Sequence, residues 1–334
     1  MRQRKSLELY PLTMCYFIKR TQKCTKLFFN HYYIPFDMKK RNILTIIIFL
    51  FCVATSIAQN AENGKTGILL VHYGTSNDNS RMQTIDRLNA RVAETFTDCA
   101  VVEAYSAPSV IKMLAKRGVR KLSVSQAIDS LKTMGCSKLV VQSTMLLDGV
   151  MTEILKKEVN RVKKDFRSVS AVRPLLYSVD DCRMMIEMIN KSLFADKSVD
   201  ATKMQVVLVG HGSDSPANAM YSQIDYLLKA EGKPSWHVGT IEGFPTIDNV
   251  EKQLAGVRNP NVLLVPLLYI AGNHQKDDID GVWKQQLQAK GYHVEVFGKG
   301  LGEMNEIQEM IIGKIAAQVK DVDSGKANNA TFHK

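Results

Sequence analysis

The chain has 334 residues, 45% hydrophobic and 23% charged, so it is long enough for two domains and has neither a disordered nor a collagen-like composition. Its net charge of +11 is concentrated at the N-terminus, where residues 1–58 hold 10 Lys/Arg and 2 Asp/Glu; the remainder holds 34 and 31, or +3. The main part of the chain therefore lacks the strong basic excess of nucleic-acid-binding proteins, and we expect no nucleic-acid partner.

The N-terminal segment has the layout of a secretory signal. A basic cluster at Lys39–Arg41 precedes an apolar run from Ile43 to Ala54, and Ser56-Ile57-Ala58 forms a small-x-small cleavage site. We expect residues 38–58 to be a signal peptide that is cleaved after Ala58. The mature protein is then exported, with the periplasm as its expected location. Residues 1–37 are expected to be a non-structural extension.

Two other fates of this segment are less favoured. The apolar run of about 12 residues is short for a bilayer core of about 30 Å, so we expect no membrane span after signal removal. Lipid attachment at Cys52 is the second alternative, but Phe51 before it is bulkier than that processing normally tolerates.

After the signal, apolar runs and helical patterns alternate. Residues 67–76 (GILLVHYGTS) predict a buried strand ending in Gly and hydroxyl residues, and Ile85, Leu88, Val92 and Phe96 are spaced to share one face of a following helix. Further strands are expected near residues 99–104, 139–149 and 171–178, with a helix at 152–166. Unbroken Val/Leu/Ile runs separated by helices indicate a parallel sheet buried on both faces.

The second half repeats this design. Residues 206–216 (VVLVGHGSDSP) match the first opening, with Gly212 in the place of Gly74, and residues 262–272 match 139–149 without a gap. Strands near 236–241 and 293–297 and a helix at 303–319 complete the set. We therefore predict an α/β fold of two similar doubly wound parallel-sheet lobes facing across a cleft, where such sheets bind ligands.

The expected lobes are residues 59–199 and 200–322. A polar stretch at 195–203 separates them, and residues 323–334 form a polar, disordered tail.

Histidines are candidates for chemistry at the strand ends. His72, His211 and His237 occupy strand positions where a histidine is more often a hydrogen-bonded structural residue than a ligand. His274 differs, because it follows the apolar run ending at Gly272 and is among the first residues of a polar segment. The end of an apolar strand is a favoured active-site position in this class of sheet. The residue type of His274 fits a metal ligand or a general base, and the alternative is a histidine at a helix N-terminus with capping neighbours.

Glu242 lies where another apolar strand enters a Gly/Pro turn. This carboxylate could bind a metal or transfer a proton, or it could be an exposed turn residue. With His274 it would offer nitrogen and oxygen to a borderline divalent ion such as Co²⁺, Fe²⁺, Ni²⁺ or Zn²⁺. The chain has no GxGxxG, GxxxxGK[ST], HExxH or GxSxG, which argues against nucleotide-binding, zincin and serine-hydrolase functions.

At these residues the chain resembles the anaerobic cobalt chelatases, the sirohydrochlorin cobaltochelatases of the CbiK type, which have a ferrochelatase-like fold. The resemblance covers most of residues 66–320. It rests on four blocks in family order: GTS at 74–76, GHGSDSPANAMY at 210–221, VGTIEGFPTIDNV at 238–250 and VPLLYIAGNHQKDDIDG at 265–281.

The resemblance implies a tetrapyrrole in the cleft and insertion of Co²⁺ or Fe²⁺ into sirohydrochlorin or a related macrocycle without ATP, as in anaerobic cobalamin biosynthesis. It implies no organic cofactor, the divalent metal being a substrate. Catalytic and metal-binding roles fall on His274 and Glu242. The residues expected to line the ring are Gly74, Thr75, Ser76, Gly210, His211, Gly212 and Ser213. A homo-oligomer is left open.

One segment departs from the family pattern. The family has a further active-site histidine in a segment like PLHxxxGEE, whereas Met145 stands in that place here and the acidic pair is absent. A thioether cannot take a pyrrole proton, although it can ligate soft or low-spin iron. This departure and the export signal raise an alternative function, an exported protein that binds haem or another tetrapyrrole, or removes iron from haem, with His274 and Met145 as axial ligands.

Overall fold

The computed structural model describes residues 64–196 and 200–325. The expected N-terminal extension, the signal peptide and most of the expected tail lie outside these ranges. Within them, no helix combines the length and the apolarity needed to span a membrane. Two four-stranded sheets form the framework, and every strand pair in both of them is parallel.

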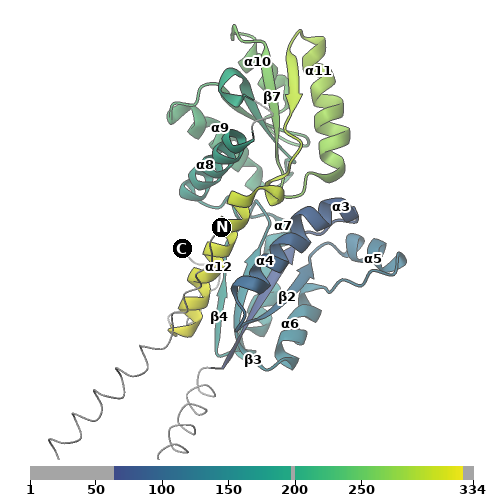
Figure 1. Cartoon of the computed structure of the whole chain (residues 1–334), viewed down its shortest axis with the longest axis vertical. Coiled ribbons are helices and arrows are strands. Elements are labelled where there is room, and N and C mark those ends of the chain that lie inside the picture. The colour runs from purple at the N-terminus through teal and green to yellow at the C-terminus, as the bar shows by residue number, and fades with distance from the viewer. Residues whose placement is uncertain (1–63, 197–199, 326–334) are drawn as a thin grey trace, which may run out of the picture. The chain divides into compact units, whose positions relative to one another are not determined.

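The first sheet has the strand order β2-β1-β3-β4 (Figure 1). Its strands are β1 (Lys65–His72), β2 (Ala100–Tyr105), β3 (Cys136–Ser143) and β4 (Ser168–Ala171). The helical segments that follow these strands are α3 (Asp78–Arg81), the π-helix η1 (Met82–Asp86), α4 (Arg87–Thr95), α5 (Pro108–Lys116), α6 (Val124–Thr133), α7 (Val150–Val162), η2 (Lys163–Asp165) and α8 (Val179–Ala195).

The second sheet repeats this order as β6-β5-β7-β8. Its strands are β5 (Gln205–Gly210), β6 (Trp236–Thr240), β7 (Asn261–Leu267) and β8 (His293–Val296). The associated helical segments are η3 (Ala201–Lys203), η4 (Pro216–Asn218), α9 (Ala219–Ala230), α10 (Ile247–Leu254), the π-helix η5 (His274–Trp283), α11 (Lys284–Ala289), η6 (Leu301–Glu303) and α12 (Asn305–Asp323). The predicted duplication of two doubly wound parallel-sheet lobes is therefore confirmed.

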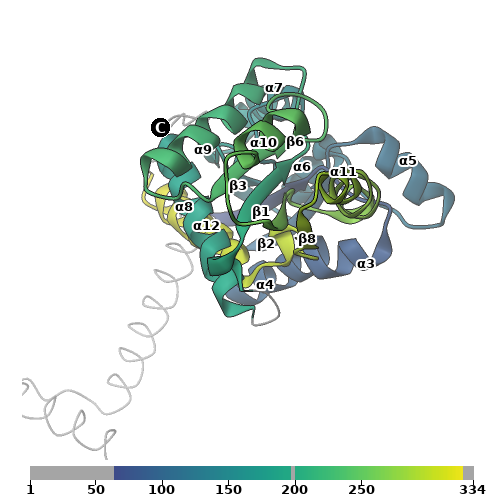
Figure 2. The ribbon, with the colours of Figure 1, turned by 90° about the horizontal axis from the view of Figure 1, so that it is seen from above.

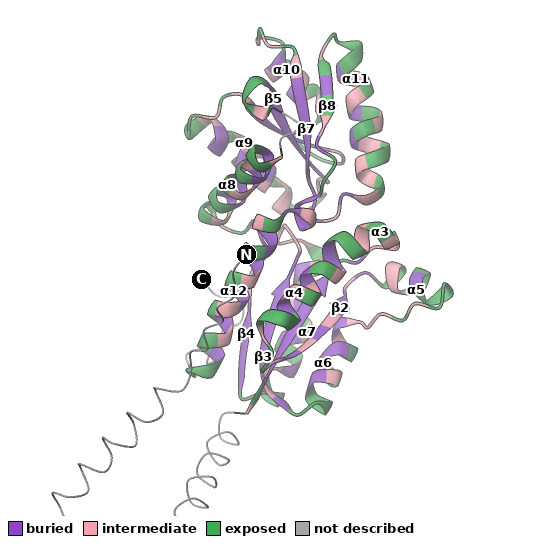
Figure 3. Cartoon of the chain, in the orientation of Figure 1, coloured by how far each residue is buried: buried purple, intermediate pink, exposed green. Residues whose placement is uncertain are grey.

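The apolar runs that predicted the central strands lie in the cores of the two lobes (Figure 3). Residues 206–209 of β5 and 262–265 of β7 are fully buried, as expected for strands covered by helices on both faces. The expected strand at 171–178 is wrong in its limits, because β4 ends at Ala171. Pro174 has no N–H to donate to a strand ladder, and Ser178 caps α8.

The two lobes exchange helices. Helix α8 follows the last strand of the first sheet, but it packs with α9 of the second lobe, where Cys182 contacts Met220 and Arg183 pairs with Glu231 (Figures 1 and 2). Helix α12 follows the second sheet but returns to β3 and β4 of the first. There the ammonium of Lys138 lies 2.9 Å from the Asp323 carboxylate.

The helices therefore cross the polar stretch that lies between the two sheets. The two sheets divide near the polar stretch at 195–203. Helix α8, which precedes this stretch, lies with the second lobe, and helix α12, the last helix, packs on the first sheet. One apolar cluster, which includes Ile68, Ile189, Leu208 and Ile311, consequently joins both lobes.

Candidate functional site

The carboxyl ends of the two sheets lie against each other. A Cβ atom placed on Gly149, after β3, would be 3.9 Å from the Ser215 hydroxyl oxygen, after β5. Across the same junction, the rings of His72 and Tyr269 are stacked with 6.5 Å between their centroids. The predicted site residues therefore belong to two sheet edges that the fold brings together.

His274 is the first residue of the π-helix η5, which Ile279 and Trp283 anchor in the core of the second lobe. Its Nδ1 atom lies 2.8 Å from the Asp278 carboxylate, and 45% of its side chain is exposed. This hydrogen bond fixes the ring and leaves Nε2 as the nitrogen directed elsewhere. A π-helical turn is rare and frequently occurs at functional sites.

His211 lies against His274. It follows β5, and its ring centroid is 4.8 Å from that of His274 in an edge-on arrangement. Its Nδ1 contacts the carbonyl oxygen of Gly212 at 3.3 Å. The sequence predicts that His211 lines the ring and that His274 alone carries the imidazole chemistry, whereas the structure pairs the two imidazoles.

Glu242 lies next to His211 through the main chain. Its N–H donates to the His211 carbonyl at 2.7 Å. Gly212 makes this approach possible, because it has φ +92° and a Cβ there would lie only 1.5 Å from the Glu242 carbonyl oxygen. Glu242 is exposed. Over the described ranges, no three His, Cys, Asp or Glu side chains are already gathered as a metal cluster.

Met145 makes its recorded contacts inside the first lobe. Its sulfur accepts a hydrogen bond from the Thr152 hydroxyl at 3.6 Å, and its carbonyl accepts from the N–H of Leu175. The side chain packs beside the apolar cluster formed by β3 and α7. The structure thus joins His211 to the His274 ring and to the Glu242 main chain, while the contacts of Met145 given above lie within the first lobe.

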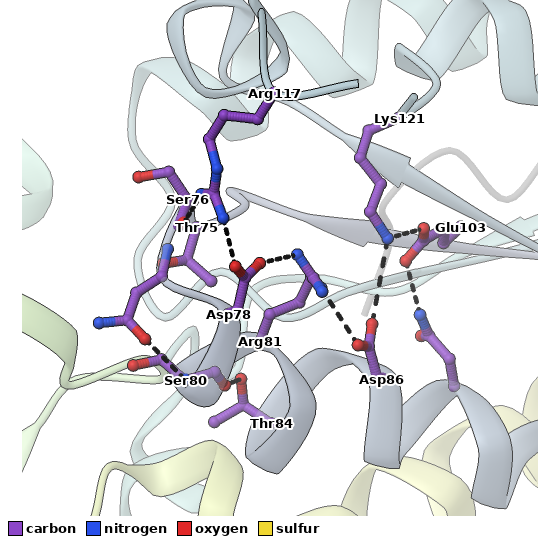
Figure 4. Close-up of polar contacts among 12 residues, drawn as sticks. Thr75, Ser76, Asp78, Ser80, Arg81, Thr84, Asp86, Glu103, Arg117 and Lys121 are labelled. Atoms are coloured by element: carbon purple, nitrogen blue, oxygen red, sulfur yellow. Dashed lines mark hydrogen bonds and ion pairs between the residues drawn. The ribbon is translucent and has the colours of Figure 1, made fainter. Parts of the chain in front are cut away.

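The Gly74–Ser76 loop is held by an ion-pair network (Figure 4). Gly74 is buried with φ +100°, and a Cβ there would clash with the ring of Tyr105. Arg117 donates to the Ser76 carbonyl and pairs with Asp78. This network fixes the path of the loop that the sequence analysis assigned to the ring wall.

The same network continues toward the core. Arg81 bridges Asp78 and Asp86 at 2.6 and 3.1 Å, and Lys121 pairs with Glu103 (Figure 4). The Arg81 and Lys121 side chains are mostly buried, whereas Asp78 and Asp86 are partly exposed, so the network joins the loop to the interior of the first lobe.

Two other histidines are structural. The ring nitrogens of His72 lie 3.0 Å from Thr144 Oγ1 and 3.0 Å from Asn89 Oδ1, and burial lowers the pKa of His72 to about 4. His237 is held between Gln253 and Gln205, and burial lowers its pKa as well. The expectation of hydrogen-bonded structural histidines is confirmed for this pair.

Two solved chelatase structures share this architecture. SirB from Bacillus subtilis with Fe³⁺ has a TM-score of 0.58 and 14% identity, covering 80% of this chain and 100% of that one. The sirohydrochlorin chelatase SirB from Bacillus subtilis subspecies spizizenii in complex with cobalt has a TM-score of 0.55 and 14% identity, covering 79% and 98%. The fold is therefore that of the two-lobed α/β chelatases.

Within that class, residues 66–320 match the family described as cobalt chelatase (CbiK), so the chain belongs to this family. It is 26% identical over 256 residues to the sirohydrochlorin cobaltochelatase of Salmonella typhimurium, covering 75% of this chain and 95% of the relative. It is 27% identical over 273 residues to the sirohydrochlorin cobaltochelatase CbiKC of Nitratidesulfovibrio vulgaris, covering 79% and 94%. The resemblance inferred from the four blocks is confirmed.

Proposed function

We propose that this protein is a sirohydrochlorin chelatase that inserts Co²⁺ or Fe²⁺ into the macrocycle without an organic cofactor. The observation that carries the proposal is the pairing of His211 with His274 beside the Glu242 backbone, at the meeting edges of the two sheets. Family membership and the names of the relatives above support the same reaction.

Metal insertion requires that two pyrrole N–H protons leave the ring while the metal passes from protein ligands to four ring nitrogens. His274 is suited to deliver the metal, because its hydrogen bond to Asp278 orients the ring and leaves Nε2 for the cation. His211 supplies a second imidazole within the same site. Both imidazoles can therefore contact the incoming metal, and either can accept a pyrrole proton once the metal has passed to the macrocycle.

Glu242 would attract the incoming cation with its carboxylate. Its position in an exposed turn supports a capture role, because a substrate metal must leave the protein within each turnover. Imidazole nitrogen and carboxylate oxygen together suit borderline ions such as Co²⁺ and Fe²⁺.

Met145 is not needed in this scheme. The recorded contacts of Met145 lie within the first lobe, and His211 offers the second nitrogen. The relatives and solved structures named above do not favour the haem alternative.

Export remains part of the proposal. It is supported by the basic, apolar and small-residue order of residues 38–58, which lie outside the described ranges. Cell fractionation and N-terminal sequencing of the native protein test it. A new N-terminus at Gln59 in the periplasmic fraction is expected, whereas a cytoplasmic protein that retains residues 38–58 would contradict it.

The reaction is tested by following the absorbance of sirohydrochlorin with Co²⁺ under anaerobic conditions. The wild-type protein should accelerate metallation over the uncatalysed rate, and His274→Ala should abolish that acceleration. His293→Ala, which alters an exposed histidine of β8, is the matched control and should retain activity. Full activity of His274→Ala would show that the site is wrongly assigned.

A further inference from the structure

The loops after β1 and β5 are held by different chemistry. In the second lobe, the Ser213 N–H donates to the side-chain oxygen of Asn218 at 3.0 Å, and the Asn218 amide group donates to a main-chain carbonyl at 2.7 Å. In the first lobe, the guanidinium of Arg117 donates to the Ser76 carbonyl. The loop of the first lobe is thus fixed by a charged group, whereas these bonds of the second loop are neutral.

Asp78 is the carboxylate that two guanidinium groups share beside the first loop (Figure 4). One of its oxygens lies 2.6 Å from Nη1 of Arg81, and the other pairs with Nη2 of Arg117. The hydrogen bond from Arg117 lowers the pKa of Asp78 below its usual value. Asp78 therefore links the loop, which Arg117 holds, to the helical segment that contains Arg81.

Helix α3, which begins at Asp78, contacts the turn that leads to His274. The side chain of Asn77 caps this helix by accepting a hydrogen bond from the Ser80 N–H at 3.0 Å. A Cβ atom placed on Gly272 would lie 3.9 Å from the hydroxyl oxygen of Ser80. Gly272 precedes His274 by two residues. Helix α3 therefore connects the loop expected to line the macrocycle with the turn that carries the proposed metal ligand.

We propose that Asp78 is a positioning residue for metal insertion, because its two ion pairs fix the Gly74–Ser76 loop and α3 against the turn of His274. This inference rests on the proposed function. A wall that contacts the macrocycle equally in the bound substrate and in the transition state contributes to binding and leaves the rate of metal transfer unchanged. Displacing the loop should therefore raise KM for the macrocycle and leave kcat unaltered.

The ion pairs of Asp78 act on geometry more than on stability. The side chains of Arg117 and Asp78 are 44% and 45% exposed, and ion pairs with this much contact to water stabilise a fold only slightly. Asp78→Asn keeps the size of the side chain and removes its charge. The variant should therefore fold normally, with a loop that is no longer held in place.

The test compares Asp78→Asn with a matched control. Asp180→Asn removes a carboxylate in the first turn of α8, which pairs with Arg183 at 2.9 Å and at the same three-residue spacing as Asp78 with Arg81. Asp78→Asn should raise KM for sirohydrochlorin about tenfold at an unchanged kcat, and weaken binding of metal-free sirohydrochlorin by the same factor. Its Co²⁺ affinity, measured by calorimetry without macrocycle, should stay at the wild-type value, as should every property of Asp180→Asn.

A second variant approaches the same contact from its other side. Arg117→Gln should also raise KM for sirohydrochlorin at an unchanged kcat. In the double variant with Asp78→Asn, the rise in KM should be well below the product of the two single effects, because both changes break one ion pair. Fully multiplicative effects would mean that the two residues act separately, which contradicts the proposal.

The outcomes separate the positioning role from the function. If the wild type metallates sirohydrochlorin and Asp78→Asn has the same KM, the positioning role is wrong and the chelatase function stands. If the wild type neither binds nor metallates sirohydrochlorin, the function fails and the role of Asp78 fails with it. If Asp78→Asn loses Co²⁺ affinity as strongly as macrocycle affinity, the carboxylate acts on the metal and not through the loop.

Discussion

The imidazole of His211 lies edge-on to that of His274, with 4.8 Å between the ring centroids. The rings follow β5 and β7, which are neighbours in the second sheet, so the pairing results from strand order rather than from sequence proximity. The parallel arrangement places both residues at the same sheet edge.

Removing His211 should therefore affect the metal as strongly as removing His274. We expect His211→Ala to weaken Co²⁺ binding by more than about tenfold, because one of two nearby nitrogen ligands is lost. Calorimetric titration with Co²⁺ measures the effect, with His293→Ala as the control. Wild-type affinity in His211→Ala would mean that this ring only lines the macrocycle pocket.

Asp278 should affect metal binding through its hydrogen bond to His274. Asp278→Asn keeps the size of the side chain but removes the charge that holds Nδ1–H of His274 at 2.8 Å. The expected loss in Co²⁺ affinity is roughly 10- to 100-fold, as for other partners that orient a ligating histidine. Asp280→Asn, which changes an exposed carboxylate of the same helix, should bind normally. Equal affinities for both variants would argue against an orienting role.

Met145 should be replaceable. Met145→Leu conserves volume beside Thr152 and should lower the free energy of unfolding by less than about 1.5 kcal/mol. Since the sulfur is not required in the proposed mechanism, the rate of Co²⁺ insertion should match that of the wild type. Denaturant unfolding and the sirohydrochlorin assay measure the two quantities. Loss of insertion in a stable Met145→Leu protein would restore Met145 as a metal ligand.

The buried His72 should make stability dependent on pH. Burial lowers its pKa from 6.5 to about 4, so between these values the unfolded chain holds a proton at this ring that the folded chain does not. Stability should therefore fall as the pH drops from about 6.5 toward 4, by up to about 3 kcal/mol from this residue. The lowered pKa of His237 adds to the same trend.

His72→Gln isolates this contribution. Urea unfolding at about pH 5 and about pH 7.5 should show a smaller difference in free energy for the variant than for the wild type. His293→Ala, which alters an exposed ring, should keep the full difference. An unaltered pH dependence in His72→Gln would mean that the ring does not stay neutral inside the folded protein.

Much of the fold could be predicted from the sequence. Apolar runs such as those ending at His72 and Gly210, separated by helical patterns, are typical of a parallel sheet buried on both faces, and their repetition indicated the two-lobed class. The helix exchange could not be predicted in the same way. The apolar faces of α8 and α12 indicate burial, but an amphipathic pattern does not identify the sheet that covers it.

The candidate site was only partly predictable. His274 and Glu242 were found because each follows an apolar strand at a Gly-containing turn. The association of His211 with His274 depended on β5 and β7 being neighbours, which strand-end patterns alone do not specify.

The crossing of α8 and α12 has a consequence for dissecting the molecule. A cut in the polar stretch after α8 would leave each fragment with a helix whose natural sheet is on the other fragment. Both fragments would then expose apolar surface to water, and neither should fold stably on its own. When the two fragments are mixed, however, they should reassemble, because each carries the helix that covers the apolar surface of the other.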